Sequence, residues 1–142
     1  MIKFLKLIII LVFLSVTVSC KPDDLRAMAS NAITVTYDGR TCLPLESFIP
    51  QGQQVEVKLV NQSDKDFSWF FIIFPLDGAF DPQDQDNIYF SASAPANSTE
   101  ETTFTAPMMP ARYDTLCMPS DDPTQIILKY ILVVEPHTSR TQ

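Results

Sequence analysis

The most reactive side chains in this 142-residue chain are three cysteines and one histidine. The cysteines are Cys20, Cys42 and Cys117, and the histidine is His137. A cysteine thiolate can bind copper together with thioethers, and two thiols can join in a disulfide. One histidine near the end of the chain is too few for a His-rich metal motif, and no Ser/His/Asp order with a nucleophile elbow is present. We therefore expect a protein that is not an enzyme, with sulfur as its candidate chemistry.

The thioethers offer one possible metal site. Met108, Met109 and Met118 flank Cys117 on both sides. Three converging thioethers bind Cu(I) well, whereas methionines in loops commonly fill irregular gaps in packing. Packing is the simpler interpretation, and copper is the alternative.

An acidic loop offers a second possible metal site. It lies between residues 75 and 87 and contains Asp77, Asp81, Asp84 and Asp86. Carboxylates are hard oxygen ligands of the kind that calcium prefers. Their spacing does not match the EF-hand pattern, so we interpret the segment as a solvated acidic loop.

The N-terminal segment has the pattern of an export signal. Lys3 and Lys6 precede an almost continuous apolar run from Leu7 to Val18. This run is too short for a typical transmembrane helix and has the right length for a signal-peptide core. Export would place the rest of the chain in an oxidising compartment.

The end of this segment resembles the bacterial lipobox. It reads Val16-Thr17-Val18-Ser19-Cys20, with threonine where leucine is usual three residues before the cysteine. The resemblance implies cleavage before Cys20 and attachment of lipid to it. We expect a lipoprotein-type signal peptide over residues 1–19 and a polar tether over residues 20–31. A plain cleaved signal and a retained anchor are the alternatives.

The charge of the chain excludes one class of partner. The formal net charge is -7, whereas a protein that binds nucleic acid needs a basic face. An acidic surface of this kind keeps a protein soluble. We expect no nucleic-acid partner.

The rest of the chain has the pattern of strands separated by turns. Val55 to Asn61 alternates between apolar and polar side chains, as in an antiparallel strand with one buried face. Phe67 to Phe74 is aromatic and nearly free of polar residues, which predicts a strand covered on both faces. Asp38-Gly39 predicts a turn, and Pro44 and Pro50 predict an irregular or edge segment.

About seven or eight such strands predict an all-β fold, a Greek-key β-sandwich. We expect it to span residues 32–135, followed by a polar tail over residues 136–142. The cysteines fit this arrangement by count. If Cys20 carries lipid, Cys42 and Cys117 remain and could pair, although the sequence does not show the distance between them.

Several short motifs resemble the cupredoxin-like family in their order and spacing. They are Gly52-x-x-Val55-x-Val57-x-Leu59-x-Asn61, Phe104-x-Ala106-Pro107 and Tyr113-x-x-x-Cys117, followed by a last apolar strand. In that family the equivalent cysteine often binds copper, with a histidine and a methionine in the loop that follows. The resemblance covers roughly residues 33–134 and implies a cupredoxin-like Greek-key β-sandwich.

The copper ligands of that family are not retained. A type 1 site needs two imidazoles and a thiolate, with a weak axial thioether. The resemblance places the imidazoles near Phe67 or Ser68 and near Ser120, and none of these residues is histidine. The segment from Tyr37 to Cys42, Tyr-Asp-Gly-Arg-Thr-Cys, resembles exported cupredoxin-like proteins in which a Cys–Cys bridge replaces the metal. By this resemblance we expect a Cys42–Cys117 disulfide and no cofactor.

These expectations together describe a non-catalytic extracytoplasmic domain, exported and tethered to the cell membrane by lipid on Cys20. Fold analogy suggests a role in binding or assembly, with the membrane and a protein of the cell envelope as partners. The alternative is a copper-binding or electron-transfer protein that uses Cys117, Met118, Met108 and Met109. A free thiol on Cys117 would favour that alternative.

Overall fold

The computed structural model describes residues 25–135, apart from residues 75, 77–79 and 123. The predicted signal peptide with Cys20, and the predicted tail with His137, lie outside the described residues. Within this part of the chain, the only helices are two 3-10 helices, η1 (Leu25–Met28) and η2 (Pro82–Asn87). The strands are β1 (Ala32–Tyr37), β2 (Cys42–Leu43), β3 (Glu46–Pro50), β4 (Gln54–Asn61), β5 (Phe67–Ile72), β6 (Ile88–Ala94), β7 (Thr99–Thr105), β8 (Ala111–Pro119) and β9 (Ile127–Val134).

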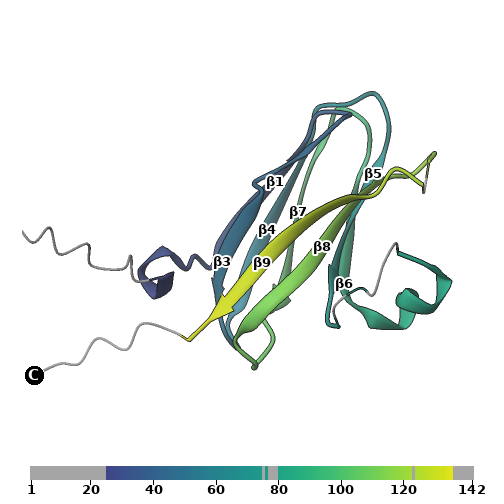
Figure 1. Cartoon of the computed structure of the whole chain (residues 1–142). Helices are drawn as coiled ribbons and strands as arrows, with labels where there is room; N and C mark the ends of the chain where they lie inside the picture. The colour runs from purple at the N-terminus through teal and green to yellow at the C-terminus, as the bar shows by residue number, and fades with distance from the viewer. Residues whose placement is uncertain (1–24, 75, 77–79, 123, 136–142) are drawn as a thin grey trace, which may run out of the picture.

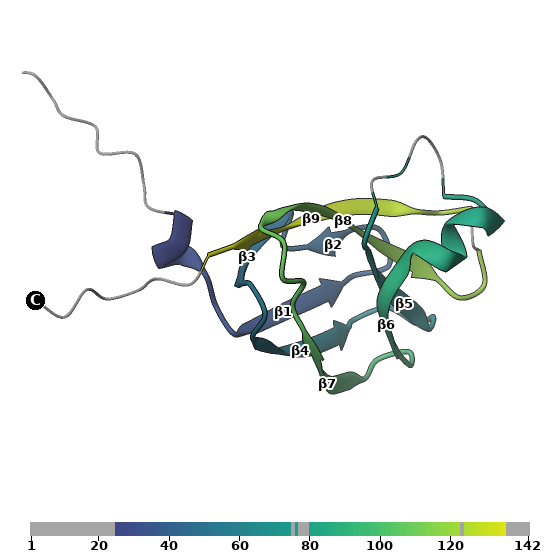
Figure 2. The ribbon, with the colours of Figure 1, turned by 90° about the horizontal axis from the view of Figure 1, so that it is seen from below.

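The nine strands form two sheets that pack face to face (Figures 1 and 2). One sheet has the order β2-β1-β4-β7, and the other has the order β3-β9-β8-β5-β6. The pairs β1–β4 and β3–β9 are parallel, and every other pair is antiparallel. The prediction of an all-β sandwich is confirmed. No helix in the described part of the chain is long and apolar enough to cross a membrane.

The strand count exceeds the predicted seven or eight because the chain changes sheets around Pro44. β2 ends at Leu43 in the first sheet, and β3 begins at Glu46 in the second. Proline has no N–H to donate to a sheet ladder, so the strand is divided there. Both pieces are edge strands, as Pro44 and Pro50 predicted.

The core between the sheets follows the alternation seen in the sequence. Val55, Val57 and Leu59 of β4 are buried, and so are Phe67, Trp69 and Phe71 of β5. Rings from different strands pack together in the core, with the ring centroids of Phe71 and Phe104 5.5 Å apart. Burial of these apolar surfaces is the main source of stability.

The aromatic run of β5 is shorter than predicted. The strand ends at Ile72, and Phe74 is 62% exposed. The inner face of the strand is buried as predicted, whereas the outer face is only partly covered, with Ser68 and Phe70 half-buried. Part of that cover comes from the segment after β5. There the ring of Phe80 stacks on that of Phe70, and Asp114 accepts a hydrogen bond from the backbone N–H of Leu76.

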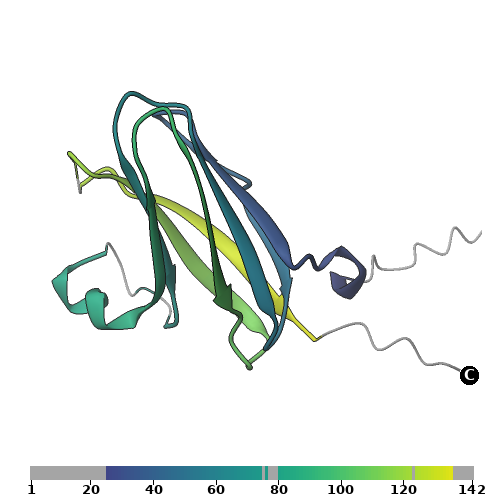
Figure 3. The same ribbon diagram turned by 180° about the vertical axis from the view of Figure 1, so that it is seen from behind.

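The loops gather at two opposite ends of the sandwich (Figures 1 and 3). We call residues 38–41, 62–66, 95–98 and 120–126 the distal loops. The other end, which we call the terminal end, carries η1, the end of β9, the loops over residues 51–53 and 106–110, and the start of β6 with η2 beside it. Cys117 lies toward the distal loops, because β8 runs from the terminal end to that end.

Candidate functional site

Cys42 and Cys117 form a disulfide, with an S–S distance of 2.03 Å and a Cα–Cα distance of 6.4 Å. Cys42 is in β2 of one sheet and Cys117 is in β8 of the other, so the bond joins the two layers. Both side chains are buried, at 0% and 1% exposure. The pairing predicted from the family resemblance is confirmed.

Two features of the sequence bring these cysteines together. In β8, Tyr113, Thr115 and Cys117 alternate with outward residues and therefore face the core. Cys42 follows a tight turn that pairs it with Tyr37 of β1. Gly39 occupies that turn with φ of +92°, a conformation that glycine adopts without a steric penalty.

Asp38 stabilises the same turn through its side chain. Its Oδ1 accepts hydrogen bonds from the backbone N–H groups of Arg40 and Thr41, each at 2.8 Å. These bonds favour the ionised carboxylate and hold the pKa of Asp38 below its ordinary value of 3.8. The turn that delivers Cys42 to the disulfide is therefore most stable when Asp38 is charged.

The residues at the positions expected for copper-binding imidazoles take part in packing and hydrogen bonding. The ring of Phe67 is fully buried, with its centroid 5.0 Å from that of Tyr37. Ser68 points to the outer face, where its hydroxyl is 2.8 Å from that of Ser93. Ser120 donates its backbone N–H to the carbonyl of Asp66. These residues close the distal end by packing and hydrogen bonding.

Asn61 connects three of the segments at this end. It is 97% buried, and its side-chain amide donates to the backbone carbonyls of Lys65, Ala94 and Pro95 at 2.8–3.0 Å. Its Oδ1 accepts from the backbone N–H and the hydroxyl of Ser63. Because buried polar groups are costly when unpaired, this residue fixes the loop after β4 against the end of β6.

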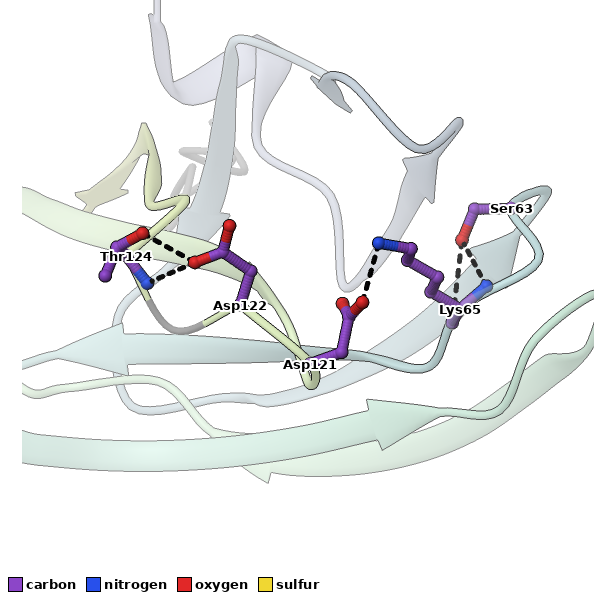
Figure 4. Close-up of polar contacts among 5 residues, drawn as sticks. All are labelled: Ser63, Lys65, Asp121, Asp122 and Thr124. Atoms are coloured by element: carbon purple, nitrogen blue, oxygen red, sulfur yellow. Dashed lines mark hydrogen bonds and ion pairs between the residues drawn. The ribbon is translucent and has the colours of Figure 1, made fainter.

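Charged side chains link the distal loops on the surface (Figure 4). Lys65 pairs with Asp121 at 2.6 Å, and this hydrogen bond raises the pKa of Lys65 above its ordinary value of 10.5. Asp122 accepts hydrogen bonds from the backbone N–H and the hydroxyl of Thr124, which hold the pKa of its carboxyl low. Both contacts are exposed to solvent, so they order the loops more than they stabilise the fold.

The methionines proposed as copper ligands do not converge. Met118 follows Cys117 directly, so its side chain points to the opposite face of β8. Met108 and Met109 precede the other end of β8, about 20 Å from Cys117 at roughly 3.3 Å per residue. The sulfur of Cys117 is itself bonded to Cys42, which leaves no thiolate in this state. The described residues contain no group of three or more His, Cys, Asp or Glu that could hold a metal ion.

Two aspartates of the acidic loop accept hydrogen bonds within the loop itself. Asp81 caps η2 by accepting from the backbone N–H of Gln83, and Asp84 accepts from the backbone N–H of Asp81. The other oxygen of Asp84 accepts from the side-chain amide of Asn87. Asp77 lies outside the described residues. These bonds account for Asp81 and Asp84 as a helix cap, whereas Asp86 is exposed to solvent.

Space beside the disulfide is limited. A small pocket of about 10 Å³ lies beside Cys42, Trp69 and Cys117, and residues of β1, β3, β8 and β9 also line it. This volume is about what one water molecule needs. The pocket next to the sulfur atoms is therefore far smaller than an ordinary ligand site.

Comparison with known proteins identifies the fold. No protein-family model matches the sequence, and no curated protein matches it. Among solved structures, reduced auracyanin from the photosynthetic bacterium Roseiflexus castenholzii aligns with a TM-score of 0.60 and 25% identity. The alignment covers 75% of this chain and 98% of that one.

Two further auracyanins align over most of their length. Auracyanin B has a TM-score of 0.60 and 17% identity, over 72% of this chain and 88% of that one. Auracyanin A, a "blue" copper protein from the green thermophilic bacterium Chloroflexus aurantiacus, has a TM-score of 0.57 and 21% identity, over 72% and 98%. The described part of the chain is therefore a cupredoxin-like domain, as the sequence motifs predicted.

Sequence reasoning missed the structural role of Asn61. The sequence motif ends at this residue, but its side chain makes five hydrogen bonds, two of which reach carbonyls more than thirty residues away in the chain. One signal was available, because Asn61 occupies an inward position in the alternation of β4. A polar residue at a buried position needs partners, and nearby loops are where it finds them.

Proposed function

We propose that this chain is a non-catalytic, membrane-tethered extracytoplasmic domain that acts in binding or assembly, with a cupredoxin-like fold that no longer holds type 1 copper. The signal-like N-terminus and the lipobox-like sequence before Cys20 support export and anchoring. The membrane and a protein of the cell envelope are the partners that fit this placement. The fold by itself does not define the activity, so the proposal depends on the site.

The observation that carries the proposal is the disulfide between Cys42 and Cys117. A thiolate is the indispensable ligand of a blue-copper centre, and a sulfur in a disulfide cannot supply it. The residues at the imidazole positions, Phe67, Ser68 and Ser120, offer no nitrogen ligand. The sulfur of Cys117 then serves to join the two sheets.

Copper titration of the oxidised mature protein tests this part of the proposal. We expect no free thiol by thiol counting, and no visible band of the kind that a Cu(II)–thiolate bond gives. The matched variant is Cys42→Ala, which frees the thiol of Cys117 and leaves Phe67, Ser68 and Ser120 unchanged. A blue band in either protein would support the alternative, a copper-binding or electron-transfer role that uses Cys117.

The anchor is tested separately through Cys20. We expect the chain to incorporate labelled palmitate and to sediment with membranes, and Cys20→Ser to lose the label. Retention of the label in Cys20→Ser would contradict lipidation at this residue. Crosslinking in intact membranes, followed by identification of the captured protein, tests the role in binding or assembly.

A further inference from the structure

The terminal end of the sandwich exposes an apolar loop that the proposed function does not use. Met108 and Met109 lie between Pro107 and Pro110, and they are 74% and 68% exposed. η1, which carries the 53% exposed Met28, lies at the same end (Figure 1). We call Met108 and Met109, with the prolines on either side, the methionine tip.

The backbone around the methionine tip is fixed. Pro107 accepts a hydrogen bond from the backbone N–H of Gly52 at 3.2 Å, and Ala106 donates to the carbonyl of Gln53 at 2.8 Å. The hydroxyl of Tyr113 donates to the carbonyl of Met109 at 2.8 Å. The two thioether side chains are thus presented to solvent by a loop that is bonded at both of its ends.

The methionine tip lies on the side from which the predicted lipid anchor leaves the domain. Cys20 is twelve residues before Ala32, the first residue of β1. An extended chain reaches at most about 3.5 Å per residue, so the tether spans no more than roughly 40 Å. A tip held this close to a bilayer has a high effective concentration at its surface, and weak contacts are then sufficient.

The distribution of charge favours the same orientation. Residues 27–31, 51–53 and 106–110 include no charged side chain. The distal loops carry five carboxylates and two cations: Asp38, Asp64, Asp66, Asp121 and Asp122, with Arg40 and Lys65. A surface of anionic lipids therefore repels the distal loops more strongly than it repels the methionine tip and the loops next to it. η2, which carries Asp84 and Asp86, lies beside the start of β6 at the terminal end, on the side of the sandwich away from η1 (Figures 1 and 3).

We propose that the methionine tip inserts into the lipid surface that carries the anchor and holds the sandwich with its distal loops pointing away from the membrane. This inference rests on the proposed lipid tether at Cys20. Methionine suits the role, because its unbranched side chain is apolar and adapts to an irregular surface. The distal loops are then the part of the domain presented to a partner.

Depth-dependent fluorescence quenching tests the inference on the lipidated chain in vesicles of zwitterionic and anionic lipids with brominated acyl chains. An environment-sensitive label is attached to Met109→Cys and, as the matched control, to Gln62→Cys in an exposed distal loop. We expect the label at position 109 to lose at least about half of its intensity, because the tip lies at the acyl-chain boundary. We expect the label at position 62 to be unaffected.

A second substitution separates insertion from mere proximity. Met108→Asp, placed in the labelled Met109→Cys chain, should abolish quenching because an unpaired carboxylate is expensive to bury. Its melting temperature should stay unchanged, since Met108 is exposed. Equal quenching at positions 109 and 62, or none at 109, would overturn the inference. The inference would also be overturned if the label at position 109 were protected from aqueous iodide in native membranes but not in lipid vesicles, because a protein would then cover the tip.

Palmitate incorporation in the same preparation separates this inference from the proposed function. A lipidated chain whose label at position 109 stays in water leaves the anchor intact and refutes insertion. An unlabelled Cys20 refutes the tether instead. In that case the mature chain is held on vesicles by an N-terminal hexahistidine tag and a nickel-chelating lipid, and the quenching measurement still decides for or against the methionine tip.

Discussion

Removal of the Cys42–Cys117 disulfide should cost a large part of the stability of the domain. The bond closes a loop of 75 residues, and the chain-entropy relation for a loop of that length gives about 4.5 kcal/mol at 25 °C. About 110 ordered residues carry an unfolding entropy near 0.23 kcal/mol per degree, so the melting temperature should fall by roughly 20 °C. This loss is comparable to the total stability of many small domains.

Thermal and urea unfolding of three variants measures the effect. Cys42→Ala, Cys117→Ala and the double variant should lose the same free energy of unfolding within about 0.5 kcal/mol, because each breaks the same single bond. The urea dependence should steepen, since an unfolded chain without the bond exposes more surface. Reduction of the native protein with a thiol should reproduce the double variant once the chain has been unfolded in its presence.

Two results would refute this reasoning. A double variant that melts within about 3 °C of the native protein would mean that the bond contributes less than 1 kcal/mol. Single variants that differ strongly from each other would mean that the loss comes from local packing around one cysteine rather than from loop closure. Each cysteine is buried, so packing around it is the obvious competing cause.

Three smaller perturbations follow from the same structure. Asn61→Ala should lower the free energy of unfolding in urea by about 3 kcal/mol, because it removes one donor from each of three buried or partly buried carbonyls and the acceptor of Ser63. The control Gln62→Ala should stay within about 0.5 kcal/mol. The ionised carboxylate of Asp38 stabilises the fold above pH 3.8, because its pKa is lower in the folded state than in the unfolded state. This stabilisation is lost as the pH falls through the folded-state pKa. Asp38→Ala should therefore make the free energy of unfolding depend less on pH at the acid end. Gly52→Ala should lower the free energy of unfolding by about 1–2 kcal/mol, because φ at this position is +64°. The loss should be similar in a Met108→Ala background, since the exposed side chain of Met108 can move away from the added methyl group.

Each of these predictions has a contradicting outcome. An Asn61→Ala variant as stable as Gln62→Ala would mean that water replaces the amide at the three carbonyls. An unchanged acid slope in Asp38→Ala would show that other carboxylates control that part of the pH profile. A Cβ added at position 52 would lie 2.5 Å from the sulfur of Met108. Full rescue of Gly52→Ala by removal of the Met108 side chain would therefore assign the cost to that clash rather than to the backbone conformation.

Much of the fold followed from local patterns. The alternation of β4 and the aromatic run of β5 predicted which faces are buried, and Pro44 and Pro50 predicted the edge strands. The end of β5 could not be predicted from composition, because Phe74 continues the aromatic run and is nevertheless exposed. The exposure of Phe74 depends on the path of the segment that follows it, and long-range contacts set that path.

The sequence by itself determined the class of fold and the absence of histidine at the expected copper positions, because both follow from residue types and their order along the chain. Only the tertiary structure decided that Cys42 and Cys117 are bonded, since the two residues lie 75 positions apart and meet through the packing of two sheets. It also decided that Met118 faces away from Cys117, and that Met108 and Met109 lie at the opposite end of β8. Strand pairing sets those distances and directions, and pairing depends on contacts that no local pattern contains.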